Sequence, residues 1–257
     1  MTKTKIDHIF NNIEHRPWPL PNEKWQWQQT WEDLAFIHWE TDGSQIRDKV
    51  PPQLEIDKYK GKAYIGIIPF RMSGVTKRGY PSPSYFCDFP EINVRTYVTY
   101  EGKPGVFFFS LDVTNFLVVW FAKLFFYLPY YQAKMSVNEI GTSINYIHLR
   151  QDKVFEATYG SRGKAMFEKE SFEVWSTERY CLYSNNKAGN IFCADVHHQQ
   201  WALETAELTI KANTMLNDFK IGQQHPSVLF SKSLDVAVYR LKKITGTDRG
   251  NKSLLYQ

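Results

Sequence analysis

The sequence predicts a single α+β domain that is dominated by antiparallel β-strands and carries two or three helices. Several segments alternate polar and apolar residues with a period of two, and residues 91–100 are the clearest of them. Turns that contain Gly and Pro separate neighbouring segments, as at residues 101–105. The 257 residues are 43% hydrophobic and 16% aromatic, which is enough apolar material for one large core. The sequence has no low-complexity linker and no repeat, which favours a single domain.

The N-terminal residues are expected to lead into the first strand without regular structure. Residues 1–22 contain three prolines and little periodicity, so they predict an extended lead-in that lies over the body of the domain. Residues 25–39 then alternate in the manner of a strand, with an interruption at Glu32-Asp33. We assign residues 23–245 to the single domain and residues 246–257 to a C-terminal tail.

The next part of the chain predicts one short helix and three strands around a long loop. In chain order these are a helix over residues 44–50 stopped by Pro51, a buried strand over residues 63–70, a Gly- and Pro-rich loop over residues 72–89, a strand over residues 91–100 and an antiparallel return over residues 106–111.

Residues 116–131 form an almost wholly apolar stretch that resembles a membrane span at first sight. A span needs about 20 apolar residues, and this stretch has sixteen, with Lys123 in the middle. A central lysine opposes insertion by roughly 2.5–3.5 kcal/mol. We therefore expect a buried helix to about Tyr127, ended before Pro129, and no membrane partner.

The C-terminal half predicts further strands and one turn. The expected strands cover residues 133–137, 144–149, 154–159, 171–177, 191–198, 205–211 and 236–241, residues 178–183 are ambiguous, and residues 185–190 form a turn.

Composition excludes several classes of function. The net charge is +4 and no block of Lys or Arg stands out, so nucleic acid is not favoured as a partner. The three cysteines, at positions 87, 181 and 193, are far apart in the sequence, which argues against a disulfide framework or a Cys-x-x-Cys metal site. The N-terminus has no apolar signal segment, so a cytoplasmic location is expected.

One strand combines polar side chains in a way that suggests a site. Glu91, Asn93, Arg95 and Tyr97 share one face of the strand over residues 91–100. Buried charges need partners, and Glu91 and Arg95 are candidates to pair with each other. The first interpretation is a polar pocket in which Arg95 holds an anionic group. The alternative is a solvent-exposed sheet face, which is common in antiparallel sheets.

Other motifs carry little chemistry. Asp195, His197 and His198 invite a metal hydrolase hypothesis, but adjacent histidines on a strand point to opposite faces. No Gly-x-Ser-x-Gly, Gly-x-Gly-x-x-Gly or Walker sequence is present. We therefore expect no metal and no other cofactor.

Seven segments resemble the YqjF-like family of uncharacterised bacterial proteins, in order and over roughly residues 20–245. They are Trp31–Trp39, Gly61–Arg71, Phe89–Tyr97, Gly105–Asp112, Leu128–Ala133, Thr177–Tyr183 and Val196–His198. This family is similar in fold to acetoacetate decarboxylase. The resemblance implies a cone-like, mostly antiparallel β-barrel around an internal cavity, with a few peripheral helices, and it places Glu91 towards that cavity.

The resemblance also implies a loss of the decarboxylase chemistry. The decarboxylase uses a lysine Schiff base within an aromatic-Pro-Lys-Lys motif, and the matching residues here are Leu128-Pro129-Tyr130-Tyr131. Tyr130 takes the position of the reactive lysine, and a phenol cannot form an imine. Lys134 lies four residues beyond Tyr130, on the same strand face if the strand continues, but about 13 Å away.

Two functions remain open from the sequence. The first is a binding protein or lyase-like enzyme for a small organic acid or ketone, with Glu91 and Tyr130 as candidate catalytic residues. Its candidate ligand-binding residues are Arg95, Tyr97, Asn93, Tyr131 and Lys134. The second is a non-catalytic structural or oligomerisation protein whose cavity is filled by its own aromatic side chains, which would make a homo-oligomer the relevant assembly.

Overall fold

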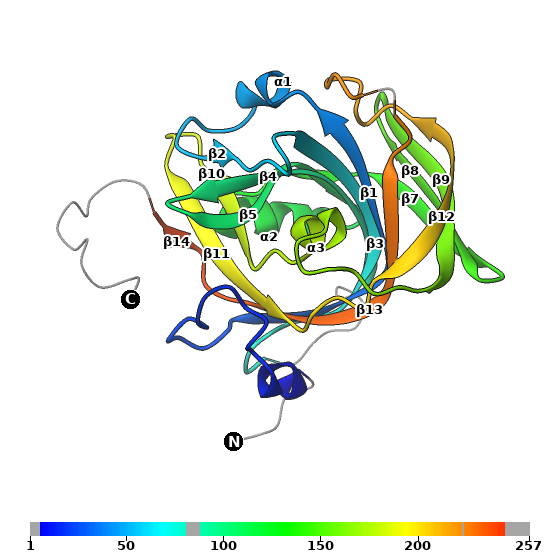
Figure 1. The fold of residues 1–257 in the computed structure, drawn as a ribbon. Helices are drawn as coiled ribbons and strands as arrows, with labels where there is room; N and C mark the ends of the chain where they lie inside the picture. Colours follow the sequence, from blue (N-terminus) through cyan, green and yellow to red (C-terminus); the bar gives the residue numbers. More distant parts are fainter. Residues whose placement is uncertain (1–5, 81–87, 223, 245–257) are drawn as a thin grey trace.

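A computed structural model of the chain describes residues 6–80, 88–222 and 224–244. Strands dominate it, as the sequence predicts (Figure 1). The strands are β1 (Trp27–Thr41), β2 (Glu55–Ile56), β3 (Ala63–Lys77), β4 (Phe89–Tyr100), β5 (Lys103–Val113), β6 (Tyr130–Gln132), β7 (Lys134–Ile140), β8 (Ser143–Arg150), β9 (Lys153–Lys164), β10 (Cys181–Asn185), β11 (Ile191–His198), β12 (Glu204–Asn213), β13 (Ser227–Val238) and β14 (Lys242–Lys243). The helices are η1 (Asp7–Asn11), α1 (Gly43–Arg47), α2 (Phe116–Phe126) and α3 (Phe172–Thr177).

The strands close into a ring and then extend beyond it. Around the ring the order is β11-β10-β5-β4-β3-β1-β13, and β13 pairs back to β11. All neighbours in the ring are antiparallel except β10 and β5, which are parallel. From β13 the sheet continues through β12, β9, β8 and β7, and this extension packs against the outside of the ring (Figure 1). The result agrees with the expected cone-like, mostly antiparallel architecture.

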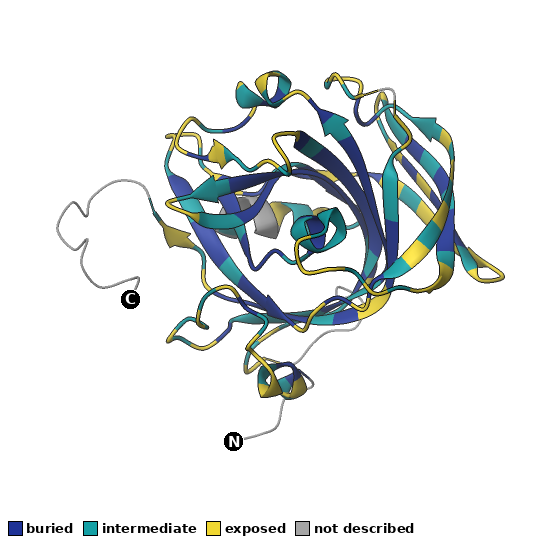
Figure 2. Ribbon diagram, in the orientation of Figure 1, coloured by how far each residue is buried: buried dark blue, intermediate teal, exposed yellow. Residues whose placement is uncertain are grey.

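The two faces of β1, β3 and β4 are both buried, so these strands carry two cores (Figure 2). Leu34 and Phe36 point into the ring, whereas Ala35 and Ile37 point outwards against the extension. We call the apolar cluster inside the ring the inner core and the cluster between the ring and β12-β9-β8-β7 the outer core. Period-two alternation therefore sorts each strand between two apolar environments.

Two helices lie within the outline of the ring in Figure 1. Asn115 caps the start of α2 by accepting a hydrogen bond from the Leu117 amide, and α2 ends at Tyr127 in a left-handed conformation. Ser171 caps the start of α3 in the same way. The part of the chain that the structure describes contains no helix long and apolar enough to span a bilayer.

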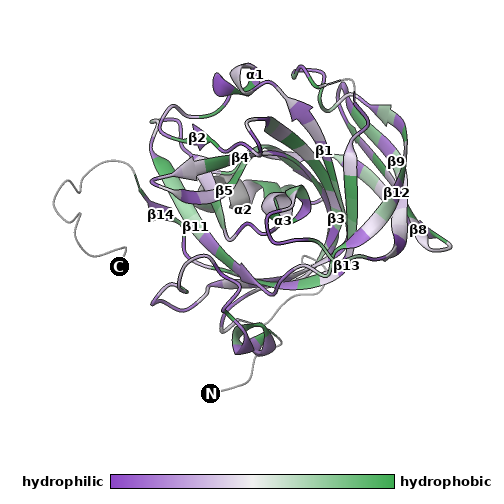
Figure 3. Cartoon of the chain, in the orientation of Figure 1, coloured by the Kyte–Doolittle hydropathy of each residue, from purple (hydrophilic) through white to green (hydrophobic). Residues whose placement is uncertain are grey.

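Most of the predicted elements are present, with strand ends that differ by a few residues. The exception is the last predicted strand, residues 236–241, because β13 begins at Ser227 and ends at Val238. The strand at residues 191–198 and the interruption of the first strand are confirmed, because Asp33 has a positive φ of 54° and the β1–β3 register shifts just after Glu32. Figure 3 shows hydrophilic residues concentrated in the turns and connecting loops.

Two expectations about single elements are wrong. Residues 171–177 are not a strand, because the Ser171 cap starts the short helix α3, which has too few residues to show a period. The loop expected over residues 72–89 begins only after Lys77, because the N-terminal half of β1 pairs with the end of β3. Residues 81–87 of that loop and the tail 246–257 lie outside the described residues.

Two further expectations hold only in part. The apolar segment forms a helix, but α2 is not buried throughout, since Phe116 and Trp120 are 61% and 63% exposed. The lead-in lies over the body of the protein, but it contains the 3-10 helix η1 rather than an entirely extended chain. Ile6 and Ile9 anchor it against the end of β13.

Candidate functional site

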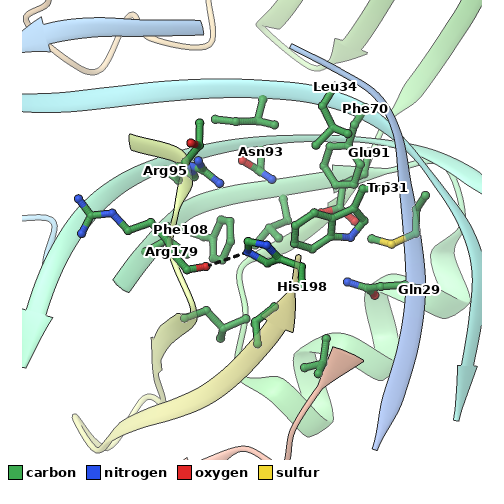
Figure 4. Close-up of a pocket in the computed structure, with 18 of the residues that line it drawn as sticks. Gln29, Trp31, Leu34, Phe70, Glu91, Asn93, Arg95, Phe108, Arg179 and His198 are labelled. Atoms are coloured by element: carbon green, nitrogen blue, oxygen red, sulfur yellow. Dashed lines mark hydrogen bonds between the residues drawn. The ribbon is translucent and has the colours of Figure 1, made fainter. Parts of the chain in front are cut away.

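The inner core encloses a cavity of about 100 Å³ (Figure 4). Its walls come from β1, β3, β4, β5, β6, β10, β11 and β13, the end of α3, and the segment that follows α2. Most lining side chains are apolar or aromatic. The polar ones are few and come from separate parts of the chain: Gln29, Glu91, Asn93, Arg95, Tyr130, Thr177, Arg179, Cys181 and His198. This composition is typical of a site for a small molecule.

Strand β4 supplies three of these polar groups. Glu91, Asn93 and Arg95 occupy alternate positions and face the cavity, while Ile92 and Val94 between them belong to the outer core (Figure 4). All five residues are buried. The solvent-exposed alternative for this strand face is therefore wrong. The outer-core partner strands bury one side of β4, and the closed ring buries the other.

Glu91 is held as a neutral acid. Burial raises the pKa of its carboxyl group to about 8, a hydrogen bond from Tyr130 opposes the rise, and the nearby negative charge of Asp112 adds to it. The Tyr130 hydroxyl lies 3.2 Å from Glu91 Oε2. Burial and the adjacent Glu91 carboxyl also raise the pKa of the Tyr130 phenol well above its usual value. At pH 7 both groups are therefore protonated and able to donate hydrogen bonds.

The expected Glu91–Arg95 ion pair does not form. The Arg95 guanidinium instead donates from one amino group to the Tyr97 hydroxyl at 3.3 Å and to the Ser176 carbonyl at 3.1 Å. Its Nε finds no hydrogen-bond partner among the described residues. Guanidinium groups stay charged in proteins. Arg95 thus carries a buried positive charge that no described carboxylate neutralises.

A second guanidinium, from Arg179, lies at the same wall. Arg179 Nη1 contacts Asp57 Oδ2 at 2.5 Å, and its Nε donates to the Trp175 carbonyl at 2.7 Å. Burial lowers the pKa of Arg179, and Asp57 opposes that shift. The remaining nitrogen, Nη2, has no hydrogen-bond partner among the described residues. Since Asp57 balances only one of the two cations, the cavity wall carries about one net positive charge.

Tyr97 lies behind the wall rather than in it. Its ring is close to both guanidinium carbons, at 5.5 Å for Arg95 and 4.8 Å for Arg179. Its hydroxyl also contacts His38 Nε2 at 2.5 Å. Burial, followed by the charges of Arg95 and Arg179, lowers the pKa of His38 well below 6.5 and keeps it neutral. Tyr97 therefore positions the two arginines and does not itself line the cavity.

His198, Trp31 and Trp201 also line the cavity, and Figure 4 shows His198 next to Arg179. Burial lowers the pKa of His198 to about 3, so its imidazole is neutral at pH 7. Both ring nitrogens face backbone carbonyls, Nδ1 that of Gln199 at 2.7 Å and Nε2 that of Arg179 at 3.4 Å, and the neutral ring carries a proton for only one of them. Trp31 stacks on Trp201 with a centroid distance of 5.8 Å, and its indole N–H has no partner among the described residues.

Two predicted ligand-binding residues lie away from the cavity. Tyr131 follows Tyr130 on β6 and points to the opposite side, where Arg150 stacks on its ring at 4.3 Å. Lys134 is exposed and starts β7, which belongs to the extension of the sheet. The even spacing between Tyr130 and Lys134 does not place them on one face, because the strand ends at Gln132 and the chain changes sheet position at Ala133.

The residues of the metal hydrolase hypothesis do not converge. His197 contacts the Ile9 carbonyl and Arg16 at the lead-in, Asp195 pairs with Lys103, and His198 faces the cavity. Within residues 6–80, 88–222 and 224–244, no three His, Cys, Asp or Glu side chains are placed to hold a metal ion.

Sequence reasoning assigned no role to Arg179 and missed the cavity positions of His198 and Trp31. Arg179 lies in the short segment between α3 and β10, where no periodic pattern predicts the direction of its side chain. His198 ends β11, and its place in the ring depends on pairing with β13, which is distant in the sequence. A signal was nevertheless present, since all three residues fall within segments that resemble the YqjF-like family.

Comparison with known proteins agrees with this resemblance. Residues 28–235 match the DUF2071 family, which is described as an uncharacterised conserved protein. The uncharacterised protein YqjF of Bacillus subtilis (strain 168) is 38% identical over 230 residues, which cover 87% of this chain and 95% of YqjF.

Two solved structures share the fold at low sequence identity. Acetoacetate decarboxylase from Legionella pneumophila superposes with a TM-score of 0.64 at 15% identity, covering 95% of this chain and 98% of that one. The enduracididine biosynthesis enzyme MppR complexed with pyruvate superposes with a TM-score of 0.60 at 11% identity, covering 90% and 93%. The fold is therefore that of acetoacetate decarboxylase, and the chain belongs to the DUF2071 family, with YqjF as a close relative.

Proposed function

We propose that the cavity binds a small organic acid or keto acid and does so without a Schiff base. One observation carries this proposal: Arg95 presents a buried guanidinium for which the described residues offer no carboxylate, in a cavity that also holds the Glu91 carboxyl, neutral at pH 7. A buried unpaired charge is unfavourable. A ligand carboxylate would pair with Arg95, and the free Nη2 of Arg179 offers a second donor.

The cavity volume limits the size of the ligand. A cavity of about 150 Å³ holds one benzene molecule, so 100 Å³ corresponds to roughly four to five non-hydrogen atoms. This range fits acetate, glyoxylate and, with slight expansion, pyruvate. The enzyme MppR, which shares the fold, forms a complex with pyruvate, a keto acid of this size class.

The absence of an amine supports binding without an imine. Tyr130 stands where the family resemblance places a reactive lysine, and no lysine is among the described residues that line the cavity. In a reaction, Glu91 would act as the proton donor to a carbonyl or enolate oxygen, and the Tyr130 hydroxyl would hold that oxygen or the Glu91 proton in place.

Calorimetric titration with pyruvate and acetate tests the proposal. We expect saturable binding to the wild type and a loss of affinity of about 100-fold or more in Arg95→Met, because the ligand carboxylate loses its charged partner. Arg162→Met, which removes an exposed guanidinium, is the matched control and should leave affinity unchanged. Equal binding to the wild type and Arg95→Met would overturn the proposal.

Borohydride reduction in the presence of pyruvate tests the second half of the proposal. We expect no covalent adduct in the intact mass of the protein. An adduct on any lysine near the cavity would show that imine chemistry is retained.

The second candidate function, a structural or oligomerisation role, draws on one observation. Phe116 and Trp120 expose large aromatic side chains on α2, and exposed apolar surface favours assembly. A protein that binds none of these acids and has a mass of two or more chains by light scattering would favour this second function.

A further inference from the structure

A large groove lies against the outside of the cavity wall. Its volume is about 930 Å³, and it runs between the end of α2 and the β10–β11 turn. Aromatic side chains of β5 form much of its lining, together with Tyr127 and Tyr183. The proposed function uses no part of this groove.

The groove and the cavity share two lining residues. Phe108 of β5 and Leu128, which follows α2, line both spaces. At this point only these two residues, backbone included, separate the cavity from the groove, and both side chains pack in the inner core. Among the described residues, the strand pairing along this edge of β5 is interrupted between Phe107, which pairs with β10, and Leu111, which pairs with β6. The two side chains are a benzyl group and an isobutyl group, neither of which has a polar atom to hold it in place.

We propose that the groove is the vestibule through which a small anion reaches the cavity, with Phe108 and Leu128 as the gate. This inference rests on the proposed function for the identity of the ligand. It concerns the route, which can be tested without any ligand.

The backbone around Leu128 is fixed, so the gate opens by rotation of side chains. The Leu128 carbonyl accepts a hydrogen bond from the Tyr130 amide at 2.9 Å, and the Pro129 carbonyl accepts one from the Leu111 amide at 3.0 Å. The Ser184 hydroxyl donates to the Phe126 carbonyl at 2.9 Å and fixes the end of α2. Side-chain rotation is far faster than movement of a loop, so such a gate permits rapid exchange.

The charge of the groove suits an anionic ligand. Two lysines, Lys49 and Lys187, are among its described lining residues, and no acidic residue is. Lys49 Nζ lies 5.3 Å from the Phe219 ring centroid, and Lys187 is exposed. Positive charge at the mouth of a site raises the rate at which anions enter it, and salt weakens that effect.

A cysteine introduced at Ile68 provides a reporter of entry that needs no ligand. The Ile68 side chain belongs to the inner core and lines the cavity, whereas the native Cys181 thiol packs on the other face of β10 with Tyr183 and Cys193. We would label the Ile68→Cys protein with methyl methanethiosulfonate and follow the peptide that carries this substitution by mass spectrometry, so that the native cysteines do not interfere. Thermal unfolding of each variant establishes that it is folded before labelling.

Widening the gate should accelerate labelling of the Ile68→Cys protein, in which each gate variant is made. We expect the rate to rise by about tenfold or more in the double variant Phe108→Ala/Leu128→Ala, because truncation removes the packing that closes the wall. Val238→Ala truncates another lining residue that does not border the groove and should leave the rate within about twofold. Leu128→Trp should slow labelling.

Two results would overturn the route. One is a labelling rate that is unchanged or undetectable in the widened variant, and the other is a faster rate in Val238→Ala than in Phe108→Ala/Leu128→Ala. Acid binding separates the route from the function. Faster labelling without binding of pyruvate or acetate would support the route and contradict the proposed function. Binding of these acids without faster labelling would support the proposed function and contradict the route.

Stopped-flow measurement of pyruvate binding tests the electrostatic part. Lys187→Glu should lower the association rate by about threefold to tenfold at low salt, and the difference should shrink as salt is added. Lys211→Glu, on the distant strand β12, is the matched control and should have no such effect.

Discussion

The inner and outer cores share the same three strands yet differ in what they bury. On β3, Ile67 packs in the outer core and its neighbour Ile68 lines the cavity. At the edge of the outer core the carboxylate of Asp112 has charged partners, since its Oδ2 contacts His148 at 2.7 Å and Arg150 at 2.6 Å, although its Oδ1 has no hydrogen-bond partner among the described residues. In the inner core, Arg95 has no such carboxylate among the described residues.

This difference suggests that the two faces of one sheet have different roles. The outer face buries apolar side chains against β8 and β9 and provides stability. The inner face contains an unfilled cavity, a neutral acid and a cation without a carboxylate partner among the described residues. Such features lower the stability of the folded protein when no ligand is bound. Local departures from good packing are expected where a site is built.

The largest expected effect is on stability, and it separates the two cores. Ile67→Ala should lower the free energy of unfolding by about 3–5 kcal/mol, because it opens a void in a packed region. Ile68→Ala removes the same atoms from the same strand, but its side chain borders a cavity and has fewer contacts to lose. We expect Ile68→Ala to lower the free energy of unfolding by a smaller amount, about 1–3 kcal/mol. Urea denaturation of both variants measures the difference.

Equal losses for the two variants would contradict this comparison. They would indicate that the inner core around Ile68 is packed as tightly as the outer core, which would weaken the argument for a ligand site.

The second effect concerns Arg95 in the absence of ligand. Replacement of a buried, uncompensated charge by an apolar side chain of similar size is expected to be neutral or to stabilise the protein by about 1–3 kcal/mol. Arg95→Met should therefore unfold at an equal or higher urea concentration than the wild type. Asp112→Ala is the opposite case, since it leaves Arg150 and His148 without their shared carboxylate and should be clearly destabilising.

A large loss of stability in Arg95→Met would change the role of this residue. It would mean that the hydrogen bonds to Tyr97 and Ser176 are structural and outweigh the unpaired charge.

How much of this arrangement could be predicted depends on where each residue lies in the chain. Glu91, Asn93 and Arg95 are on one strand, so a period of two places them together. Arg179 and His198 join them only because β10 pairs with β5 and β11 pairs with β13, which closes the ring. Such pairings are long-range, and no local pattern encodes them.

Tyr131 and Lys134 lie away from the cavity for two different reasons. Tyr131 is expected at the site from the family motif, but it directly follows Tyr130 on β6, so alternation turns its side chain to the opposite face. Lys134 lies beyond the end of β6 at Gln132 and starts β7 in the sheet extension, so even spacing no longer relates it to Tyr130. The family resemblance identifies Tyr130 as the position of interest, and the structure pairs it with Glu91.

The third effect is the pH dependence that Glu91 introduces. Its pKa is about 8 in the folded protein and near 4.5 in the unfolded chain, so between these values the folded state holds the extra proton. Stability should therefore fall as pH rises through this window, by up to about 1.4 kcal/mol per pH unit. Affinity for pyruvate should also fall above pH 8, because an ionised Glu91 repels the ligand carboxylate.

Glu91→Gln keeps the size of the side chain and cannot ionise. We expect it to remove this dependence, both in urea denaturation between about pH 5 and 9 and in calorimetric titration. If the wild type and Glu91→Gln show the same change of stability with pH, the Glu91 carboxyl is not protonated in the folded state.

The smallest effect on stability is expected at the surface of α2, where the aromatic residues belong to neither core. Trp120 is 63% exposed, whereas Trp201 of the inner core is 8% exposed. Trp120→Ser should change the free energy of unfolding by no more than about 0.5 kcal/mol, while Trp201→Ala should lower it by about 3–5 kcal/mol.

Light scattering of Trp120→Ser adds a second measurement. If the wild type is an oligomer and this variant is a monomer of unchanged chain stability, the exposed face of α2 is an interface. If the mass is the same for both proteins, Trp120 has no part in assembly, and the structural alternative for this family loses its main support.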